Sequence, residues 1–150
     1  MGERVTATFE VTGWDETPLA PPADGPPITR VVVTKTFHGD VEAQSTGELL
    51  TCQAGDGRAG YVGMERVVGA VGSRRGSFVI QHGATAGEPT SAEEPGEPGE
   101  STAPVAPVAP GRVVPGSGTG DFRGLIGTVS FQHGPEGATF RIEMTFVPGD

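Results

Sequence analysis

The sequence predicts an all-β protein whose strands follow one another as an antiparallel meander and close into a barrel. Its 25 glycines and 14 prolines make up about a quarter of the 150 residues, and these two residue types are the worst helix formers. Apolar and polar residues alternate with the two-residue period of a strand in successive runs. Short glycine-containing turns join most of these runs, as in β-hairpins.

The clearest alternation opens the chain, from Arg4 to Thr12, where Val5, Ala7 and Phe9 share one face. Seven further strands are expected, at residues 28–38, 41–53, 59–70, 76–83, 111–115, 126–133 and 138–147. Tight turns at Gly39–Asp40, Gly55–Gly57, Gly72–Ser73 and Gly134–Gly137 separate four pairs of them.

An eight-stranded antiparallel up-and-down barrel is the expected architecture, because closure removes the exposed edges of a meander. The first and last strands are among the most apolar and are expected to pair, which would seal the sheet. The interior of such a barrel is filled by side chains or holds one small ligand. An open sandwich of two sheets is the structural alternative.

Residues 1–150 are expected to form a single domain, interrupted by a flexible acidic insertion at residues 84–110. The insertion carries five glutamates, six prolines and neither Lys nor Arg. It has no aromatic residue, leucine or isoleucine, so it buries too little apolar surface to offset its ordering entropy. We interpret it as a surface insertion; a mobile lid, or a ligand for a proline-reading groove, are the alternatives.

The formal net charge of -9 disfavours nucleic acid and anionic membrane surfaces as partners. No run approaches the roughly 20 apolar residues of a membrane span. The first residues lack the apolar stretch of a secretory signal, and the single cysteine, Cys52, allows no internal disulfide. A cytoplasmic location is therefore expected, while the sequence leaves a homo-oligomer open.

Five segments carry a resemblance to a known family: residues 9–16, 33–42, 61–66, 76–82 and 114–125. They resemble small bacterial proteins of unknown function that have the allene oxide cyclase-like barrel. Allene oxide cyclases and bacterial spirotetronate-forming cyclases use comparable barrels without cofactors. The resemblance therefore implies a cofactor-free cyclase or isomerase of specialised metabolism. The insertion departs from the family, whose members run almost directly from the fifth strand to the sixth, and no catalytic motif can be carried over.

One rim of the barrel is expected to be rich in loops. In an up-and-down meander the odd-numbered strands end at the same rim, which here carries Trp14, the proline-rich residues 18–27 and the insertion. The opposite rim receives the tight turns and residues 116–125, whose Phe122 and Leu125 are expected to fold over as a plug. Barrel mouths bordered by loops are common ligand sites.

Glu65, His82 and Tyr61 are the candidate catalytic residues. A two-residue turn at Gly72–Ser73 would place Glu65 opposite Ile80, so that these three polar side chains enter the barrel together. A carboxylate in an apolar cavity has a raised pKa, which suits proton transfer near neutrality. The alternatives are an ion pair of Glu65 with Arg66, Arg30 or Lys35, or a one-residue slip that turns Glu65 outward.

The candidate ligand-binding residues are apolar or polar groups expected on the inner wall or at the loop-rich rim. They are Trp14, Phe9, Phe78, Ile80, Gln81, Phe131, His133 and Phe140. Lys35 and Glu42 are expected to form a pair on the outer wall without a role. No metal site is expected, because His38 lies at the opposite rim from the other two histidines.

Three function classes follow from this interpretation. The first is a cyclase or isomerase acting, without a cofactor, on a polyketide- or terpenoid-like lipophilic molecule in the barrel cavity. The second is a barrel that binds a small hydrophobic ligand without turnover, and the third is a purely structural role. A cavity above about 300 Å³ beside Glu65 would favour the first two. A centre filled by Phe9, Phe78, Phe131 and Phe140 would contradict both.

Overall fold

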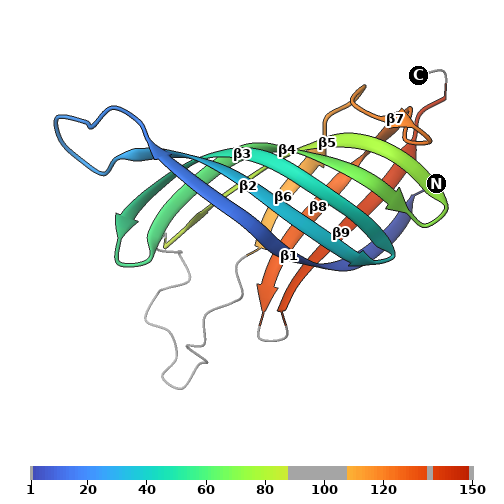
Figure 1. Cartoon of the computed structure of the whole chain (residues 1–150), viewed down its shortest axis with the longest axis horizontal. Coiled ribbons are helices and arrows are strands. Elements are labelled where there is room, and N and C mark those ends of the chain that lie inside the picture. Colours follow the sequence, from blue (N-terminus) through green and yellow to red (C-terminus); the bar gives the residue numbers. More distant parts are fainter. Residues whose placement is uncertain (1, 88–107, 135–136, 149–150) are drawn as a thin grey trace, which may run out of the picture.

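The computed structural model describes residues 2–87, 108–134 and 137–148, which form strands and turns. Eight long or medium strands make one closed antiparallel barrel, and a two-residue strand is attached to its rim (Figure 1). The bounds are β1 Glu3–Pro18, β2 Ile28–Gly39, β3 Val41–Gly55, β4 Arg58–Val71, β5 Arg74–Ala86, β6 Val108–Val113, β7 Thr119–Gly120, β8 Leu125–Gly134 and β9 Gly137–Phe146. The predicted fold class is thus confirmed.

The barrel closes where the first and last strands pair, as expected. β1 and β9 run antiparallel, with Ala7 opposite Phe140. On the other side β4 pairs with β5, which continues through β6 and β8 to β9. A single closed sheet excludes the open sandwich.

β1 is longer than predicted and carries Trp14 within the strand, where the sequence indicated a loop. The ladder with β2 continues past a bulge between Val11 and Gly13, and Trp14 lies opposite Val33. The prediction ended at Thr12 because apolar alternation stops there. Backbone pairing with β2 extends the strand without that alternation, since the side chains of this part of β1 are largely exposed.

The insertion predicted at residues 84–110 is too long, because strands occupy both of its ends. β5 runs to Ala86 and β6 begins at Val108, so residues expected to lie in the insertion are strands. The remainder, residues 88–107, lies outside the described residues, as does the flexibility expected of it.

The plug at the opposite rim is confirmed. Phe122 and Leu125 are each 1% exposed, and the Phe122 ring lies 5.0 Å from the Phe78 ring in an edge-on contact. β7 holds this segment on β5, where the Thr119 hydroxyl accepts a hydrogen bond from the backbone N–H of Ser77.

The interior of the barrel holds two separate apolar clusters. The larger one contains the buried rings Phe9, Phe37, Phe78, Phe122, Phe131 and Phe140. The Phe140 ring meets Phe37 edge-on and Phe131 at a tilt, each at 5.1 Å between centroids, so this part is packed with side chains. Phe9, Phe78, Phe131 and Phe140 thus fill this part of the barrel, and their packing contradicts a ligand held here. The smaller cluster comprises Val31, Val33 and Leu49, with Tyr61 packed against it.

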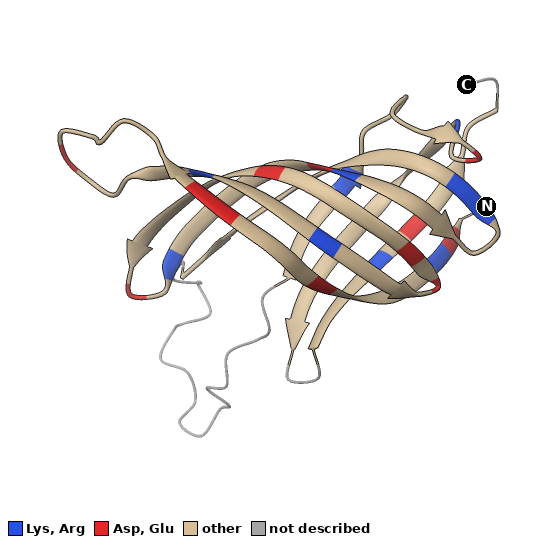
Figure 2. Cartoon of the chain, in the orientation of Figure 1, with Lys and Arg blue, Asp and Glu red and all other residues tan. Residues whose placement is uncertain are grey.

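Acidic and basic positions are both distributed over several strands of the barrel (Figure 2). Exposed ion pairs join neighbouring strands, for example Arg4 with Glu143 and Arg30 with Glu48. Among the described residues, no helix has the length and apolar character needed to span a bilayer.

Candidate functional site

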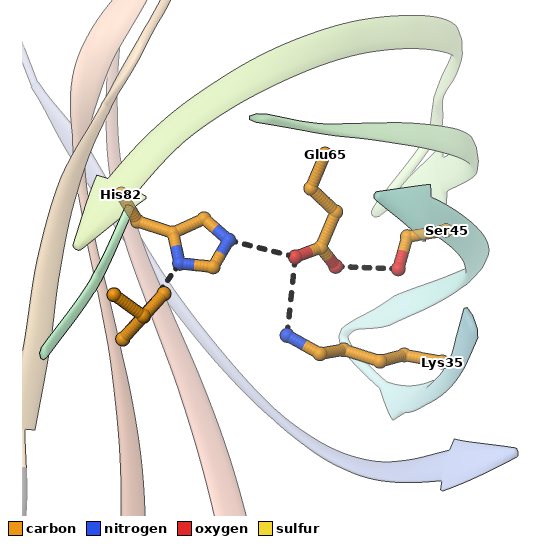
Figure 3. Close-up of polar contacts among 5 residues, drawn as sticks. Lys35, Ser45, Glu65 and His82 are labelled. Atoms are coloured by element: carbon orange, nitrogen blue, oxygen red, sulfur yellow. Dashed lines mark hydrogen bonds and ion pairs between the residues drawn. The ribbon is translucent and has the colours of Figure 1, made fainter. Parts of the chain in front are cut away.

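A layer of polar side chains lies between the two apolar clusters. Four neighbouring strands each contribute one inward-facing member: Lys35 from β2, Ser45 from β3, Glu65 from β4 and His82 from β5 (Figure 3). All four are buried, and Glu65 is only 1% exposed. Within each strand the positions beyond the polar residue are mostly apolar or glycine, so the layer interrupts the core at one level.

Glu65 is the centre of this layer. Its Oε1 accepts hydrogen bonds from Lys35 Nζ at 3.1 Å and from His82 Nε2 at 2.9 Å. Its Oε2 accepts a hydrogen bond from Ser45 Oγ at 2.5 Å. Figure 3 shows the three donors converging on the carboxylate from different strands. No described buried side-chain nitrogen or oxygen lacks a hydrogen-bond partner.

Glycines beside the layer provide the space for these long side chains. His82 lies between Gly63 on β4 and Gly111 on β6, and Gly47 on β3 is opposite Glu65. A Cβ atom at residue 111 would lie 2.7 Å from the Cβ of His82, and one at residue 47 would lie 3.0 Å from the Cβ of Glu65. Larger residues at these positions would displace the polar groups.

The pKa of Glu65 is lowered, although burial by itself raises it. The hydrogen bond from His82, the charge of Lys35 and the hydrogen bond from Ser45 outweigh the cost of burial. The sequence-based expectation of a raised pKa was therefore wrong. It considered an apolar cavity and did not include the donors from three strands. Glu65 is thus an ionised acceptor near neutral pH and is unsuited to act as a general acid.

This lowered pKa predicts a specific loss of stability in acid. A carboxyl whose pKa is lower in the folded than in the unfolded chain stabilises the fold above its unfolded pKa, near 4.5, and loses that contribution as the pH falls through its folded pKa. We expect the unfolding midpoint in urea to fall more steeply below pH 4.5 in the wild type than in the double variant Lys35→Met, Glu65→Gln. Equal slopes would contradict this.

Lys35 is held over aromatic rings. Its Nζ lies 3.9 Å from the centroid of the Phe131 ring and 5.0 Å from that of Phe9. Burial lowers the pKa of Lys35, while the charge of Glu65 and the hydrogen bond to it act in the opposite direction. The ion pair and the ring faces together replace part of the hydration that the ammonium loses.

Tyr61 connects the layer with the smaller apolar cluster. Its hydroxyl is 2.7 Å from Nδ1 of His82, and the two rings lie edge-on at 5.4 Å. Burial, followed by the negative charge of Glu65, raises the pKa of Tyr61 to about 12. Tyr61 is therefore a neutral phenol at physiological pH, the outermost member of a Tyr61–His82–Glu65 chain.

The tyrosine can be titrated directly, because the chain contains one Tyr. We expect the tyrosinate absorbance at 295 nm to appear with a midpoint near pH 12, above the ordinary value of 10.0. In Glu65→Gln the midpoint should move towards the ordinary value, because one of the two causes is removed. A wild-type midpoint near 10 in the folded protein would contradict the buried hydrogen bond.

The structure brings the three predicted catalytic residues together. Glu65 lies opposite Ile80 and Gly63 lies opposite His82, which is the predicted register. Their catalytic roles stay a prediction.

The predicted ligand-binding residues divide into three groups. Phe9, Phe78, Ile80, Phe131 and Phe140 belong to the larger apolar cluster. The exposed His133 packs its ring on Phe9 at 5.6 Å, and the half-exposed Trp14 donates a hydrogen bond to Glu16. Gln81 is exposed and follows the opposite alternation from its buried neighbours Ile80 and His82, which places it on the outer wall.

Ser45 was missed, and Lys35 was expected on the outer wall, although its ion pair with Glu65 was one of the alternatives. The expected outer-wall pair with Glu42 does not form. Lys35 points inward to Glu65, while Glu42 accepts a hydrogen bond from the backbone N–H of Gly39. Of the alternatives considered for Glu65, the ion pair with Lys35 is the one observed. A readable signal existed, because Lys35 shares the alternation of Val31, Val33 and Phe37.

The described residues contain no group of three or more His, Cys, Asp and Glu side chains arranged to hold a metal ion. His38 pairs with Glu10 on the exposed surface at the opposite rim. Cys52 is a free, partly buried thiol in β3.

Two depressions lie on the outer wall rather than in the barrel. One, of about 500 Å³, is over β4, β5 and β6, and the other, of about 400 Å³, is over β5, β6, β8 and β9. They share Gln81 and Arg112.

Comparisons with known proteins agree with the fold and assign no activity. The family described as "Protein of unknown function (DUF3224)" matches residues 5–95. A crystal structure of a protein of unknown function from the DUF3224 family, from Shewanella oneidensis MR-1, is 31% identical in sequence. It superposes with a TM-score of 0.75 over 99% of this chain and 100% of that one. A search of curated proteins finds no match.

Proposed function

The chain belongs to the DUF3224 family, whose description assigns no function, and from the geometry of its polar layer we propose that it is a cofactor-free isomerase or cyclase. It would move a proton on a lipophilic small molecule of polyketide- or terpenoid-like chemistry. The observation that carries the proposal is the chain of hydrogen bonds from a partly buried phenol, Tyr61, through His82 to the ionised Glu65. Perturbed ionisable groups in such chains are frequent at functional sites.

Each residue has a distinct role in the proposed transfer. When His82 carries protons on both ring nitrogens, it donates to Tyr61 and to Glu65, and the Tyr61 O–H is free to point at a ligand. Tyr61 then gives its proton to the ligand and takes the Nδ1 proton of His82. The reverse transfer, from another atom of the ligand, restores both residues, so no net proton is consumed. Lys35 and Ser45 are positioning residues that keep Glu65 ionised.

The apolar cluster beside Tyr61 supports a lipophilic ligand. Val31, Val33 and Leu49 pack against this ring on the side away from Phe37 and Phe140. The larger cluster is filled by rings, so the proposed ligand would lie against Tyr61 at the other side of the polar layer. A barrel that binds such a ligand without turnover is the second candidate, favoured by the same cluster.

A β,γ-unsaturated ketone such as 3-cyclohexenone tests proton transfer. Its conversion to the conjugated ketone needs removal of one proton and return of another, and absorbance follows it. We expect the wild type to accelerate this conversion and Tyr61→Phe to lose at least about 100-fold of the rate.

His38→Gln, on the exposed opposite rim, serves as the control and should keep the wild-type rate. Equal rates in Tyr61→Phe and wild type would contradict the assigned role. Ligand binding without any turnover across a series of such ketones would favour the second candidate.

A further inference from the structure

The depression over β4, β5 and β6 lies directly outside the candidate site. His82, Gly83, Pro110 and Gly111 are among its lining residues. His82 therefore belongs both to the wall of this depression and to the buried polar layer. Gly83 lies opposite Val62 on β4, and a Cβ atom at residue 83 would lie 3.2 Å from Cγ1 of Val62.

The wall of the barrel separates at this point. The ladder between β5 and β6 ends at the pair His82–Gly111, and the next positions are Gly83 and Pro110. Proline has no backbone N–H with which to continue the ladder. Beyond this pair β5 stays with β4 and β6 stays with β8, and the two strands diverge (Figure 1). The depression is thus located at a seam in the sheet.

The lining combines an apolar side with a cationic side. Val62 is 60% exposed and Met64 is 51% exposed, so the two side chains form the apolar side of the depression. The amide of Gln81 lies on β5 opposite Met64, and Arg112 lies opposite Gln81 on β6.

Among the residues that the structure describes, Arg112 has no charged partner directly opposite it on β5 or β8. Its cross-strand neighbours on the two sides, Gln81 and Thr128, are both uncharged. By contrast, Arg4 and Arg30 pair with glutamates across adjacent strands. A guanidinium binds a carboxylate through two parallel hydrogen bonds, and the apolar side would cover an aliphatic chain.

We propose that this depression binds an amphipathic monocarboxylate. The carboxylate lies on Arg112 and Gln81, and the apolar chain lies along Val62 and Met64. The ligand is thereby held at the seam outside His82. The binding site does not depend on the proposed function. The further statement that such carboxylates are also the substrates of the barrel does rest on it.

Octanoate titrated into isotopically labelled protein tests the site by NMR. We expect the largest changes at the amides of Gly83 and Gly111 and at the methyl group of Met64. Arg112→Gln should weaken octanoate binding by at least tenfold. Arg141→Gln, which removes an exposed arginine from the outer wall of β9, should leave the affinity unchanged. The uncharged 1-octanol should bind at least tenfold more weakly than octanoate.

Equal affinities in Arg112→Gln and Arg141→Gln, or equal binding of octanol, would overturn the proposal. Changes centred on Ile126 and Thr145 would also overturn it, because those residues line the other depression. Tyr61→Phe separates the two proposals. Loss of turnover with unchanged octanoate affinity in this variant would support both proposals. Absence of saturable octanoate binding to the wild type would refute this site while leaving the Tyr61-dependent proton transfer intact.

Discussion

Replacing Glu65 by glutamine should destabilise the folded protein by about 3–5 kcal/mol at pH 6–7. The substitution keeps the size of the side chain but leaves the buried ammonium of Lys35 without its counter-charge. Urea unfolding followed by far-UV circular dichroism measures this loss. The loss should be smaller at pH 9, because a lysine with a lowered folded pKa gains stability as the pH rises towards its unfolded pKa.

The double variant Lys35→Met, Glu65→Gln is the matched control. A glutamine amide can still accept a hydrogen bond from His82 and donate one to Ser45, and the removal of Lys35 together with Glu65 leaves no unpaired ammonium. Methionine fills about the same volume as the lysine stem against Phe131. We expect the double variant to recover most of the lost stability. If it is as unstable as Glu65→Gln, an unpaired charge is not the cause.

This comparison bears on function as well as on stability. Buried ion pairs can often be replaced by apolar or neutral groups at little cost, so they are weak evidence for a structural role. A stable double variant would show that the barrel does not need the Lys35–Glu65 pair in order to fold. The presence of both charges at the level of His82 and Tyr61 would then require another explanation, and the proposed proton transfer provides one.

The relation between Glu65 and His82 could be predicted because it depends on a local turn. A two-residue hairpin at Gly72–Ser73 fixes the β4–β5 register, and the alternation of side chains then places both residues on the inner face. The plug formed by Phe122 was predictable for a similar reason. A short segment with two large apolar residues follows directly on a strand end.

The chemistry of the layer was harder to predict. The direction of the pKa shift of Glu65 depends on hydrogen-bond donors from β2, β3 and β5. How many of these donors reach the carboxylate depends on side-chain geometry across the strands. The predicted end of the first strand at Thr12 was wrong for another reason. The pairing of β1 with β2 continues through exposed residues that show no apolar alternation. The volume of the interior likewise depends on how Phe9, Phe37 and Phe131 meet in space.

Phe140→Ala should also cost about 3–5 kcal/mol, because it removes a ring that is 0% exposed from the centre of the larger cluster. The ring contacts Phe37 and Phe131, each at 5.1 Å between centroids, so the space cannot collapse without moving both. Unfolding in urea measures the loss. Val68→Ala, at a 54% exposed position on β4, is the control and should change stability by less than about 0.5 kcal/mol.

The size of this loss decides where a ligand can lie in the barrel. A loss of several kcal/mol means that Phe140 borders no large void, and a ligand must then lie beyond the polar layer, beside Tyr61. A loss below about 1.5 kcal/mol would instead indicate an existing hollow next to the ring, since little packing would be removed. The ligand site would then be on the Phe131 side of Lys35, and Lys35 rather than Tyr61 would be the polar group closest to it.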